Sequence, residues 1–391
     1  MEFDIVIIGG GIIGSSAAHF LARNPRASHI AVIEPDPSYA RASTPQGAGG
    51  VRQLFSRPEN VAMSQFSLRF YRDFAAEVSS PAFRPEIGFR QQGYLFVVDE
   101  GGAATLEENF RLQTSMGVRA ELLSVAELRN RFPSLGVEDV ALGCHSPHDG
   151  WIDPYAALQG FKQSARQNSV AYVHGRVVSL ETRDRLVTTA LLDDGREISA
   201  GVFLNTAGPW AHEVAAMVGA DLPVRPMCRV QHYWRCAEEI EQLPLVKDES
   251  GMFFRPEGNG FAGGCPSFDV EPGFCEDFDC GSFANYFEDV VWPLIAARLP
   301  KFENVKLERT WGGHYAQNLF DGNMIIGAFV PDIDNFYTAC GFSGHGVMHA
   351  PAVGRALCEL AIDGGYQTLD LSALGIERVR QGEPYAEIGI K

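Results

Sequence analysis

The chain has 391 residues, of which 46% are hydrophobic and 21% are charged, and its formal net charge is −17 at pH 7. This composition describes a globular protein with enough apolar residues for a large core, and the length predicts two domains. The acidic balance argues against binding to nucleic acid or to an anionic membrane surface. Because no apolar run approaches the roughly 20 residues that cross a bilayer, we expect no membrane span.

A strand, a turn, a helix and a second strand are predicted at the start of the chain. Residues 5–8 are β-branched throughout, which is typical of a parallel strand covered on both faces. An alanine-rich helix follows as far as Leu21, and residues 29–34 form the second strand. Since the first strand begins at the third residue, we expect no targeting segment before it and a cytoplasmic location.

Three glycines and an acidic residue mark this unit as a dinucleotide-binding site. Gly9 permits a tight turn, Gly11 lets the backbone approach a pyrophosphate, and Gly14 lets the helix pack against the strand. The helix N-terminus offers N–H groups to the phosphates. Glu34 ends the second strand, where its carboxylate can accept hydrogen bonds from a ribose 2′-hydroxyl, which argues against a 2′-phosphate. Glycine triplets alone more often form ordinary loops, but here all the features are in register.

The next segments are predicted from glycine content and from helical spacing. Residues 41–52 form either a surface linker or, as their position favours, close backbone contacts with a flat cofactor ring. Residues 61–78 have the apolar spacing of a long amphipathic helix. The eight cysteines are scattered, with no C-x-x-C pair and no histidine at ligand spacing, so we predict reduced thiols and no metal site.

The rest of the chain is predicted to contain both strands and helices, and the residue pattern first changes near residue 84. Two short strands around a turn are predicted over residues 89–98, and a helix over residues 103–116. Further strands are predicted at 171–173, 187–192, 201–205, 230–234, 251–255, 261–264 and near 335–340, and further helices at 155–167, 283–299 and 350–363. We expect the small-residue turn after residue 205 and the N-terminus of the last helix to face the cofactor.

Several motifs resemble those of the D-amino-acid-oxidase-like family of flavoproteins over essentially the whole chain. They are Arg57-Pro58-Glu59-Asn60, Gly93-Tyr94-Leu95, Arg131-Phe132-Pro133, Gly150-Trp151-Ile152-Asp153-Pro154, Asn205-Thr206-Ala207-Gly208-Pro209-Trp210 and Gly341-Phe342-Ser343-Gly344-His345-Gly346. The chain looks most like the sarcosine oxidase and dimethylglycine dehydrogenase branch.

The resemblance implies an α/β fold with an α+β second domain. A Rossmann-like FAD-binding domain would comprise residues 1–82, 150–221 and 325–391. A discontinuous substrate domain, built on a mixed or antiparallel sheet, would comprise residues 83–149 and 222–324. The FAD contacts implied by the family pattern and by the glycine-rich turns are Gly9, Gly11, Ile12, Ile13, Gly14, Glu34, Arg41, Ser43, Gln46, Gly47, Ala48, Gly49, Gly50, Val177, Ala207, Gly208, Trp210, Gly313, Gly341, Gly344, His345, Gly346, Val347 and Met348.

Departures from the family pattern affect the predicted chemistry. Gln46 stands where some relatives attach FAD through a histidine, and Gly313 where others use a cysteine, so we expect the FAD to be non-covalent. Met348 replaces the lysine with which sarcosine oxidases hold the substrate carboxylate. The carboxylate-binding arginines of glycine oxidase find no match near His314 or Gly344. The substrate's anionic end therefore needs another partner.

Candidate catalytic residues follow from the chemistry that amine oxidation needs. A guanidinium binds a carboxylate bidentately, so Arg255 is the first candidate for that role and Arg52 the second, although each could equally form an ion pair. His345 is either catalytic or structural. Tyr315 and His232 are candidates for the wall of the site.

Three functions remain open from sequence. The favoured one is oxidation of the C–N bond of a small secondary or N-substituted amino acid by hydride transfer to flavin N5, followed by hydrolysis of the imine. The others are a flavin-dependent 2-hydroxy-acid dehydrogenase and a flavoprotein that binds or assembles a respiratory partner. The resemblance places Ala262 where sarcosine oxidases carry a lysine over the flavin, which favours a dehydrogenase that passes electrons to an acceptor protein.

Overall fold

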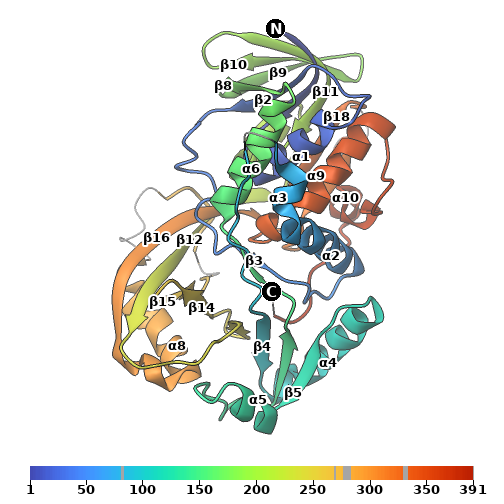
Figure 1. Ribbon diagram of the computed structural model, residues 1–391. Helices are drawn as coiled ribbons and strands as arrows, with labels where there is room; N and C mark the ends of the chain where they lie inside the picture. The colour runs from blue at the N-terminus through green and yellow to red at the C-terminus, as the bar shows by residue number, and fades with distance from the viewer. Residues whose placement is uncertain (81–82, 268–269, 276–282, 329–332, 391) are drawn as a thin grey trace.

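The computed structural model describes the chain except residues 81–82, 268–269, 276–282, 329–332 and 391. Its strands form two eight-stranded sheets and one two-stranded ribbon. Figure 1 shows the first sheet at the top of the molecule and the second at the bottom, with most of the helices beside and below the first.

The first sheet is mainly parallel and is built around β1 (Glu2–Ile8), which lies between β2 (Ile30–Glu34) and β11 (Glu197–Asn205). The sheet is completed by β8 (Ala171–His174), β9 (Val177–Arg183), β10 (Leu186–Leu192), β17 (Ile325–Ala328) and β18 (Phe336–Cys340). Ile8 pairs with both Ile33 and Asn205. The carboxyl ends of three adjacent parallel strands therefore meet at one edge, where α/β proteins bind nucleotides.

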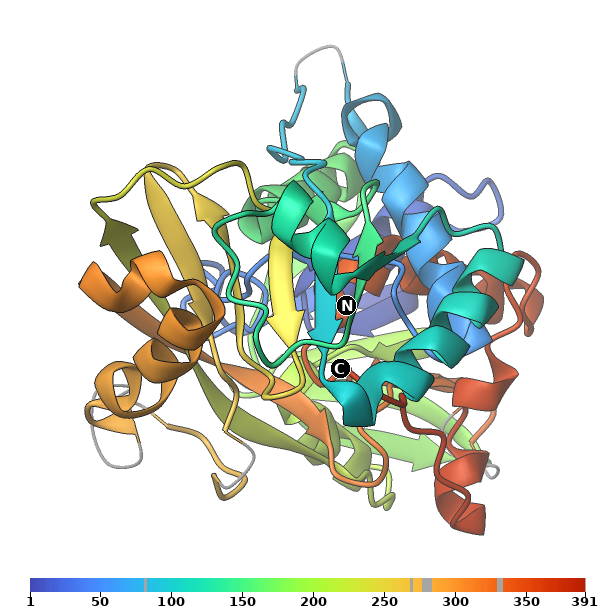
Figure 2. The ribbon, with the colours of Figure 1, turned by 90° about the horizontal axis from the view of Figure 1, so that it is seen from below.

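The second sheet is mixed and takes strands from two separate parts of the chain. In spatial order they are β16 (Val305–Asn318), β12 (Val224–Cys236), β15 (Gly260–Gly264), β14 (Phe253–Glu257), β13 (Leu245–Asp248), β4 (Tyr94–Val98), β6 (Leu142–Ser146) and β5 (Glu121–Ser124). β4 pairs in parallel with β13 across about 150 positions of sequence. In Figure 2, which views the molecule from below, strands of this sheet are seen behind the teal and orange helices that lie nearest the reader. The ribbon pairs β3 (Gly50–Val51) with β7 (Gly150–Trp151).

Helices cover one face of the first sheet and form a hydrophobic core with it. α1 (Ile12–Ala22) packs between α6 (Pro154–Gln167) and α9 (Gly346–Asp363). Small residues allow this close approach, since a Cβ atom added at Gly354 would lie 2.2 Å from Ser16 Oγ. The other α-helices are α2 (Pro58–Arg72), α3 (Phe74–Val78), α4 (Glu100–Ser115), α5 (Val125–Arg131), α7 (Ala211–Ala216), α8 (Trp292–Arg298) and α10 (Glu377–Gln381).

Some predicted elements differ from the structure. Residues 89–98 contain only β4, because Arg90 forms an isolated bridge to Trp151 instead of a second strand. The helix predicted over 61–78 is interrupted at Asp73. The helix predicted over 283–299 is a π-helix, Phe287–Val291, followed by α8, and the last helix begins at Gly346 rather than at residue 350.

The strands divide between the sheets in the same way as the predicted segments divide between domains. The segments 1–82, 150–221 and 325–391 supply the first sheet, and the segments 83–149 and 222–324 supply the second. The boundaries themselves stay a proposal. Within the described part of the chain, no helix is long and apolar enough to cross a membrane, the cysteines are free thiols, and no group of metal ligands gathers. Cys280 lies outside the described residues.

Candidate active site

A cavity of about 790 Å³ lies between the carboxyl edge of the first sheet and one face of the second. The first sheet contributes the turn after β1 and the turn after β11. The second sheet contributes side chains of β4, β13, β14 and β16, including Tyr94, Lys247, Phe253 and Tyr315. The cavity volume lies within the range that proteins use for cofactors and small ligands.

The three glycines after β1 have distinct surroundings. Gly9 has a φ of +101°, and a Cβ atom there would lie 2.6 Å from the carbonyl oxygen of Thr206. A Cβ atom at Gly14 would lie 2.0 Å from the carbonyl oxygen of Gly9, so helix and turn touch at this point. At Gly11 the nearest atom would be 3.9 Å away, and this residue lines the cavity. The backbone is therefore open to a ligand at Gly11 alone of the three.

Two helix N-termini belong to the cavity wall, as a phosphate-containing cofactor requires. α1 follows Gly11 and α9 follows His345, and neither of these two residues caps its helix with a side chain, although the Ile12 N–H donates to Thr44 Oγ1 at 3.3 Å. Ile12, Ile13, Gly346 and Val347, in the first turns of these helices, line the cavity. Backbone N–H groups and the positive ends of two helix dipoles thus favour negative charge here.

Glu34 lies at the edge of the same cavity with its carboxylate already anchored. Its Oε2 accepts a hydrogen bond from the Gly10 N–H at 2.8 Å, and its Oε1 accepts one from Asp36 N–H at 2.9 Å. Burial raises the pKa of this carboxyl, while the two backbone donors oppose that shift. The anchored carboxylate keeps an orientation suited to further hydrogen bonds from a ribose.

The two positions that lack a covalent attachment residue face each other. A Cβ atom at Gly313 would lie 2.7 Å from the Cβ atom of Gln46. The Gln46 carbonyl oxygen accepts hydrogen bonds from Gln231 Nε2 at 2.9 Å and from Trp311 Nε1 at 3.2 Å. These contacts fix the start of the glycine-rich segment against the second sheet, and Gly47, Ala48, Gly49 and Gly50 then line the cavity.

Most of the residues predicted to contact FAD lie on the cavity wall. They are Gly9, Gly11, Ile12, Ile13, Glu34, Arg41, Ser43, Gly47, Ala48, Gly49, Gly50, Val177, Ala207, Gly208, Trp210, Gly344, His345, Gly346, Val347 and Met348. Gly14, Gln46, Gly313 and Gly341 are behind the wall. Of the predicted catalytic residues, Arg52, His345 and Tyr315 line the cavity, whereas Arg255 and His232 do not.

Arg52 is a buried cation on the wall, with 4% of its surface exposed. Its guanidinium lies over the ring of Phe55 at 4.0 Å and over that of Phe96 at 5.1 Å. It donates hydrogen bonds to the Leu54 carbonyl oxygen and to His345 Nε2, the latter at 3.4 Å. None of the described carboxylates forms an ion pair with it, and burial lowers the pKa of the guanidinium.

The two candidates behind the wall have partners of their own. Arg255 forms an ion pair with Glu257 and donates from Nε to the Ala48 carbonyl oxygen at 3.0 Å. His232 is buried against Phe287, its Nδ1 lies 3.0 Å from Thr310 Oγ1, and burial lowers its pKa to about 4. Their surroundings are those of an ion pair and of a core histidine.

Sequence reasoning missed three residues on the substrate side of the wall, namely Tyr94, Lys247 and Phe253. The register pairs Lys247 with Phe96 on one side and with Phe253 on the other. A signal was present, because Leu245 and Lys247 alternate with buried Val246 and so share a face of the strand. Ala262 lies on β15 outside the cavity wall.

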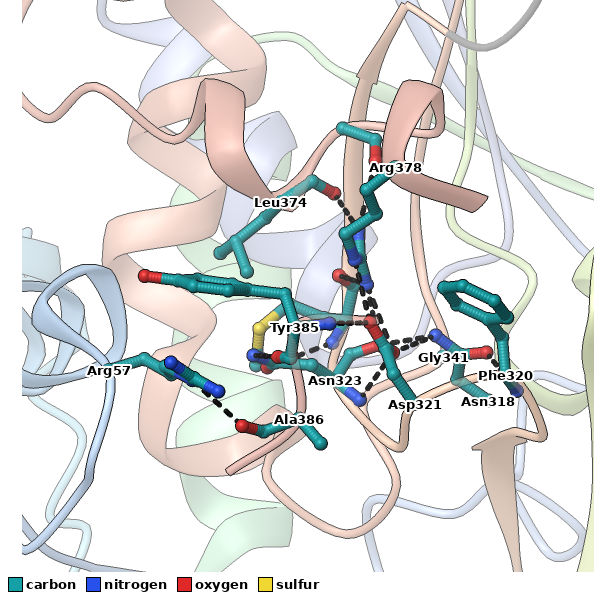
Figure 3. Close-up of polar contacts among 12 residues, drawn as sticks. Arg57, Asn318, Phe320, Asp321, Asn323, Gly341, Leu374, Arg378, Tyr385 and Ala386 are labelled. Carbon is teal, nitrogen blue, oxygen red and sulfur yellow. Dashed lines mark hydrogen bonds and ion pairs between the residues drawn. The ribbon is translucent and has the colours of Figure 1, made fainter. Parts of the chain in front are cut away.

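The C-terminal segment holds one corner of the wall in place. Figure 3 shows Arg378 of α10 turned toward Asp321, whose Oδ2 lies 2.7 Å from Arg378 Nε. The same oxygen accepts the Tyr385 N–H at 3.0 Å, and Arg57 Nε donates to the Ala386 carbonyl oxygen at 2.7 Å. Both Asp321 and Ala386 line the cavity. This network therefore connects the end of the chain to the wall.

The glycine-rich strand–helix unit, the acid that ends the second strand and the cavity closed by a second sheet define a dinucleotide-binding oxidoreductase. A family model described as FAD dependent oxidoreductase (DAO) matches residues 4–360. The chain belongs to this family, and its cofactor is FAD. The open backbone at Gly11 and the N-terminus of α1 beside it fit the phosphates of that cofactor.

Known relatives agree with this assignment. FAD-dependent oxidoreductase domain-containing protein 1 of Xenopus laevis is 36% identical, over 99% of this chain and 84% of that protein. Human mitochondrial sarcosine dehydrogenase is 24% identical, over 92% of this chain but 40% of its own length. Among solved structures, L-proline dehydrogenase from P. horikoshii has a TM-score of 0.83 and 27% identity, covering 98% of this chain and 99% of that one. Glycine oxidase from Geobacillus kaustophilus, at 21% identity and a TM-score of 0.81, shares the fold.

Proposed function

We propose that this protein oxidises the C–N bond of a small secondary or N-substituted amino acid. When bound, FAD would supply the acceptor for a hydride from the carbon next to nitrogen, and the imine product would hydrolyse in water. The observation that carries this proposal is Arg52, a buried guanidinium on the cavity wall held by aromatic rings and two neutral acceptors. A substrate carboxylate would supply the anion that such a group prefers.

The protein's side chains would bind and orient the substrate. Arg52 holds the carboxylate, while Tyr94, Phe253 and Tyr315 present rings to an apolar substituent. Burial raises the pKa of both tyrosines, so their hydroxyl groups stay protonated and act as hydrogen-bond donors. The N-terminus of α9 would stabilise the negative charge that the reduced cofactor gains.

The names of several similar proteins agree with an N-substituted amino acid as substrate. Relatives include mitochondrial sarcosine and dimethylglycine dehydrogenases, and similar structures include L-proline dehydrogenase and iminodiacetate oxidase. Sarcosine, dimethylglycine, proline and iminodiacetate all carry a carboxylate beside a substituted nitrogen. Arg52 would meet the group that these molecules share.

Further details of the proposal follow the sequence. We propose non-covalent FAD, because Gln46 and Gly313 provide no attachment atom, and an electron-acceptor protein rather than oxygen as the oxidant. The domain division given above and a cytoplasmic location belong to the same proposal. Oxidation of a 2-hydroxy acid and a binding role toward a respiratory partner are the alternatives that experiment must separate.

An anaerobic titration tests the function directly. The purified holoprotein is mixed with N-methylglycine, proline and other N-substituted amino acids, and with 2-hydroxy acids, while the visible absorption of the flavin is followed. We expect bleaching by at least one N-substituted amino acid. Bleaching by hydroxy acids alone would favour the dehydrogenase alternative, and a flavin that no compound bleaches would favour the binding role.

A further inference from the structure

Amine oxidation by hydride transfer has a requirement that Arg52 does not meet. A secondary amino acid reaches the protein as an ammonium ion, since such amines have pKa values of about 10. Its nitrogen lone pair must be free before the neighbouring carbon can release a hydride. The active site therefore needs a group that takes one proton from the substrate nitrogen.

We propose that Nζ of Lys247 is the group that accepts this proton. The inference rests on the proposed amine oxidation. In the step, an N–H bond of the substrate ammonium breaks and its proton binds the lone pair of Nζ. The C–H bonding pair then leaves with its hydrogen as a hydride to FAD, and a C=N bond forms. Substrate loses two electrons and two hydrogens, FAD gains the hydride, and Lys247 keeps the proton until solvent removes it.

The position of Lys247 is the first argument. It belongs to β13, faces the cavity beside Leu245, and pairs in register with Phe96 on β4. The ring of Phe96 carries the guanidinium of Arg52 at 5.1 Å. The substrate nitrogen is two bonds from the carboxylate carbon, so a substrate whose carboxylate binds Arg52 has its nitrogen near the side chain of Lys247.

The electrostatic surroundings are the second argument. Burial lowers the pKa of the Lys247 ammonium to about 7, and the positive charge of Arg52 acts in the same direction. Cys265 and Asp248 oppose this shift, but Asp248 is shared with Arg298 at 3.2 Å. A substantial fraction of Lys247 is then a neutral amine near neutral pH, as a base requires.

Other titratable groups of the wall are poorly suited to the task. Tyr94 and Tyr315 have raised pKa values and hold their protons. His345 receives a hydrogen bond from Arg52 at Nε2, which occupies its acceptor. Asp149, near Arg52 but outside the cavity wall, is fully buried and accepts hydrogen bonds from the Gln53 N–H and Nε2, both at 2.8 Å.

The test compares Lys247→Met, Lys247→Arg and wild type by anaerobic stopped-flow reduction across pH. Wild type should show a limiting reduction rate that rises with an inflection near pH 7. Both variants should lose roughly 100-fold near pH 7 and recover toward about pH 10, where the substrate deprotonates unaided. Lys306→Met, at a lysine whose side chain is 75% exposed, is the matched control and should keep the wild-type profile.

A second readout needs no turnover. Acetylation of lysines in the wild-type holoprotein, followed by mass spectrometry over a pH series, should give Lys247 a midpoint near 7. A Lys247 midpoint above about 9 would overturn the inference. So would variants that raise KM but keep the wild-type pH profile, a result that leaves the proposed function intact. A wild-type flavin that no amine reduces would overturn both.

Discussion

The two ends of the cavity are built by different means. At the nucleotide end the wall is backbone: the turn after β1, the N-terminus of α1, and Glu34 fixed by neighbouring N–H groups. At the substrate end the wall is side chain, with Arg52, Lys247 and Tyr315 brought together from three distant parts of the chain. The first end has features that suit any FAD, whereas the second determines which molecule is oxidised.

This difference explains which mutations should remove the cofactor and which should change only the chemistry. Backbone sites tolerate no added volume, because the ligand occupies the space that a side chain would take. Side-chain sites can lose a functional group and still bind FAD. Each prediction below exploits one half of that contrast.

The largest effect should come from Gly11→Val. A Cβ atom at this position has open space around it, so the protein should still fold, but the added methyl groups occupy the phosphate region. We expect flavin content to fall more than tenfold, measured as the ratio of visible to protein absorption after purification, with an unchanged far-ultraviolet circular dichroism spectrum. Gly365→Val, also in open space but away from the cavity, is the control. Full flavin content in Gly11→Val would contradict the assignment of the phosphate site.

The same contrast explains what could be predicted from the sequence. The nucleotide end is local, since Gly9, Gly11, Gly14 and Glu34 lie within one strand–helix–strand unit whose spacing is fixed by the fold. The substrate end depends on strand register. Lys247 reaches the cavity only because β13 pairs with β4, and the sequence around Lys247 does not predict that pairing.

The choice between the two arginines shows what sequence could not predict and one local signal that was overlooked. Arg255 and Arg52 have the same chemistry, and sequence alone does not state which one is partnered in the fold. Glu257, however, lies two positions after Arg255, and residues so spaced on a strand share a face. That spacing pointed to an ion pair. The burial of Arg52 between two aromatic rings is a tertiary property with no such local signal.

The second prediction concerns Arg52→Met. The substrate carboxylate loses a charged hydrogen-bonding partner in this variant. The activation free energy that kcat/KM reports should therefore rise by about 2 to 4 kcal/mol, mainly through KM. Flavin content should not change, because the nucleotide end is untouched. Arg255→Met should have a smaller effect on KM, since its guanidinium serves Glu257 and the Ala48 carbonyl oxygen. A larger rise in KM for Arg255→Met would return the carboxylate role to that residue.

The third prediction tests stability against pH in the nucleotide-binding half. Burial lowers the pKa of His19 on α1 to about 3, so it is neutral in the folded protein. A histidine with a lowered folded pKa stabilises fully above its unfolded pKa, about 6.5, and this contribution is lost as pH falls toward 3. As pH falls from about 6.5 to 5, His19 should lower the free energy of unfolding by about 2 kcal/mol.

Denaturant unfolding of wild type and His19→Gln at several pH values measures this contribution. The variant should lose less stability on acidification than wild type, even if it starts lower. His29→Asn is the control, because the His29 side chain is 79% exposed. Parallel pH dependences for wild type and His19→Gln would show that folding does not lower the pKa of His19.

The smallest expected effect concerns the electron acceptor, where the two halves meet at the flavin. Oxygen reduction is accelerated by a positive charge beside the reduced flavin. Ala262 cannot supply that charge, and Lys247, with a pKa of about 7, is mostly neutral at pH 8. Reduced enzyme at pH 8 should therefore react at least tenfold more slowly with air than with an acceptor dye, a difference of about 1.4 kcal/mol.

Lowering the pH to 6 should protonate Lys247 and speed reoxidation in wild type but not in Lys247→Met. Stopped-flow reoxidation in aerated buffer measures both rates, and peroxide formed at the rate of turnover at pH 8 would identify an oxidase instead.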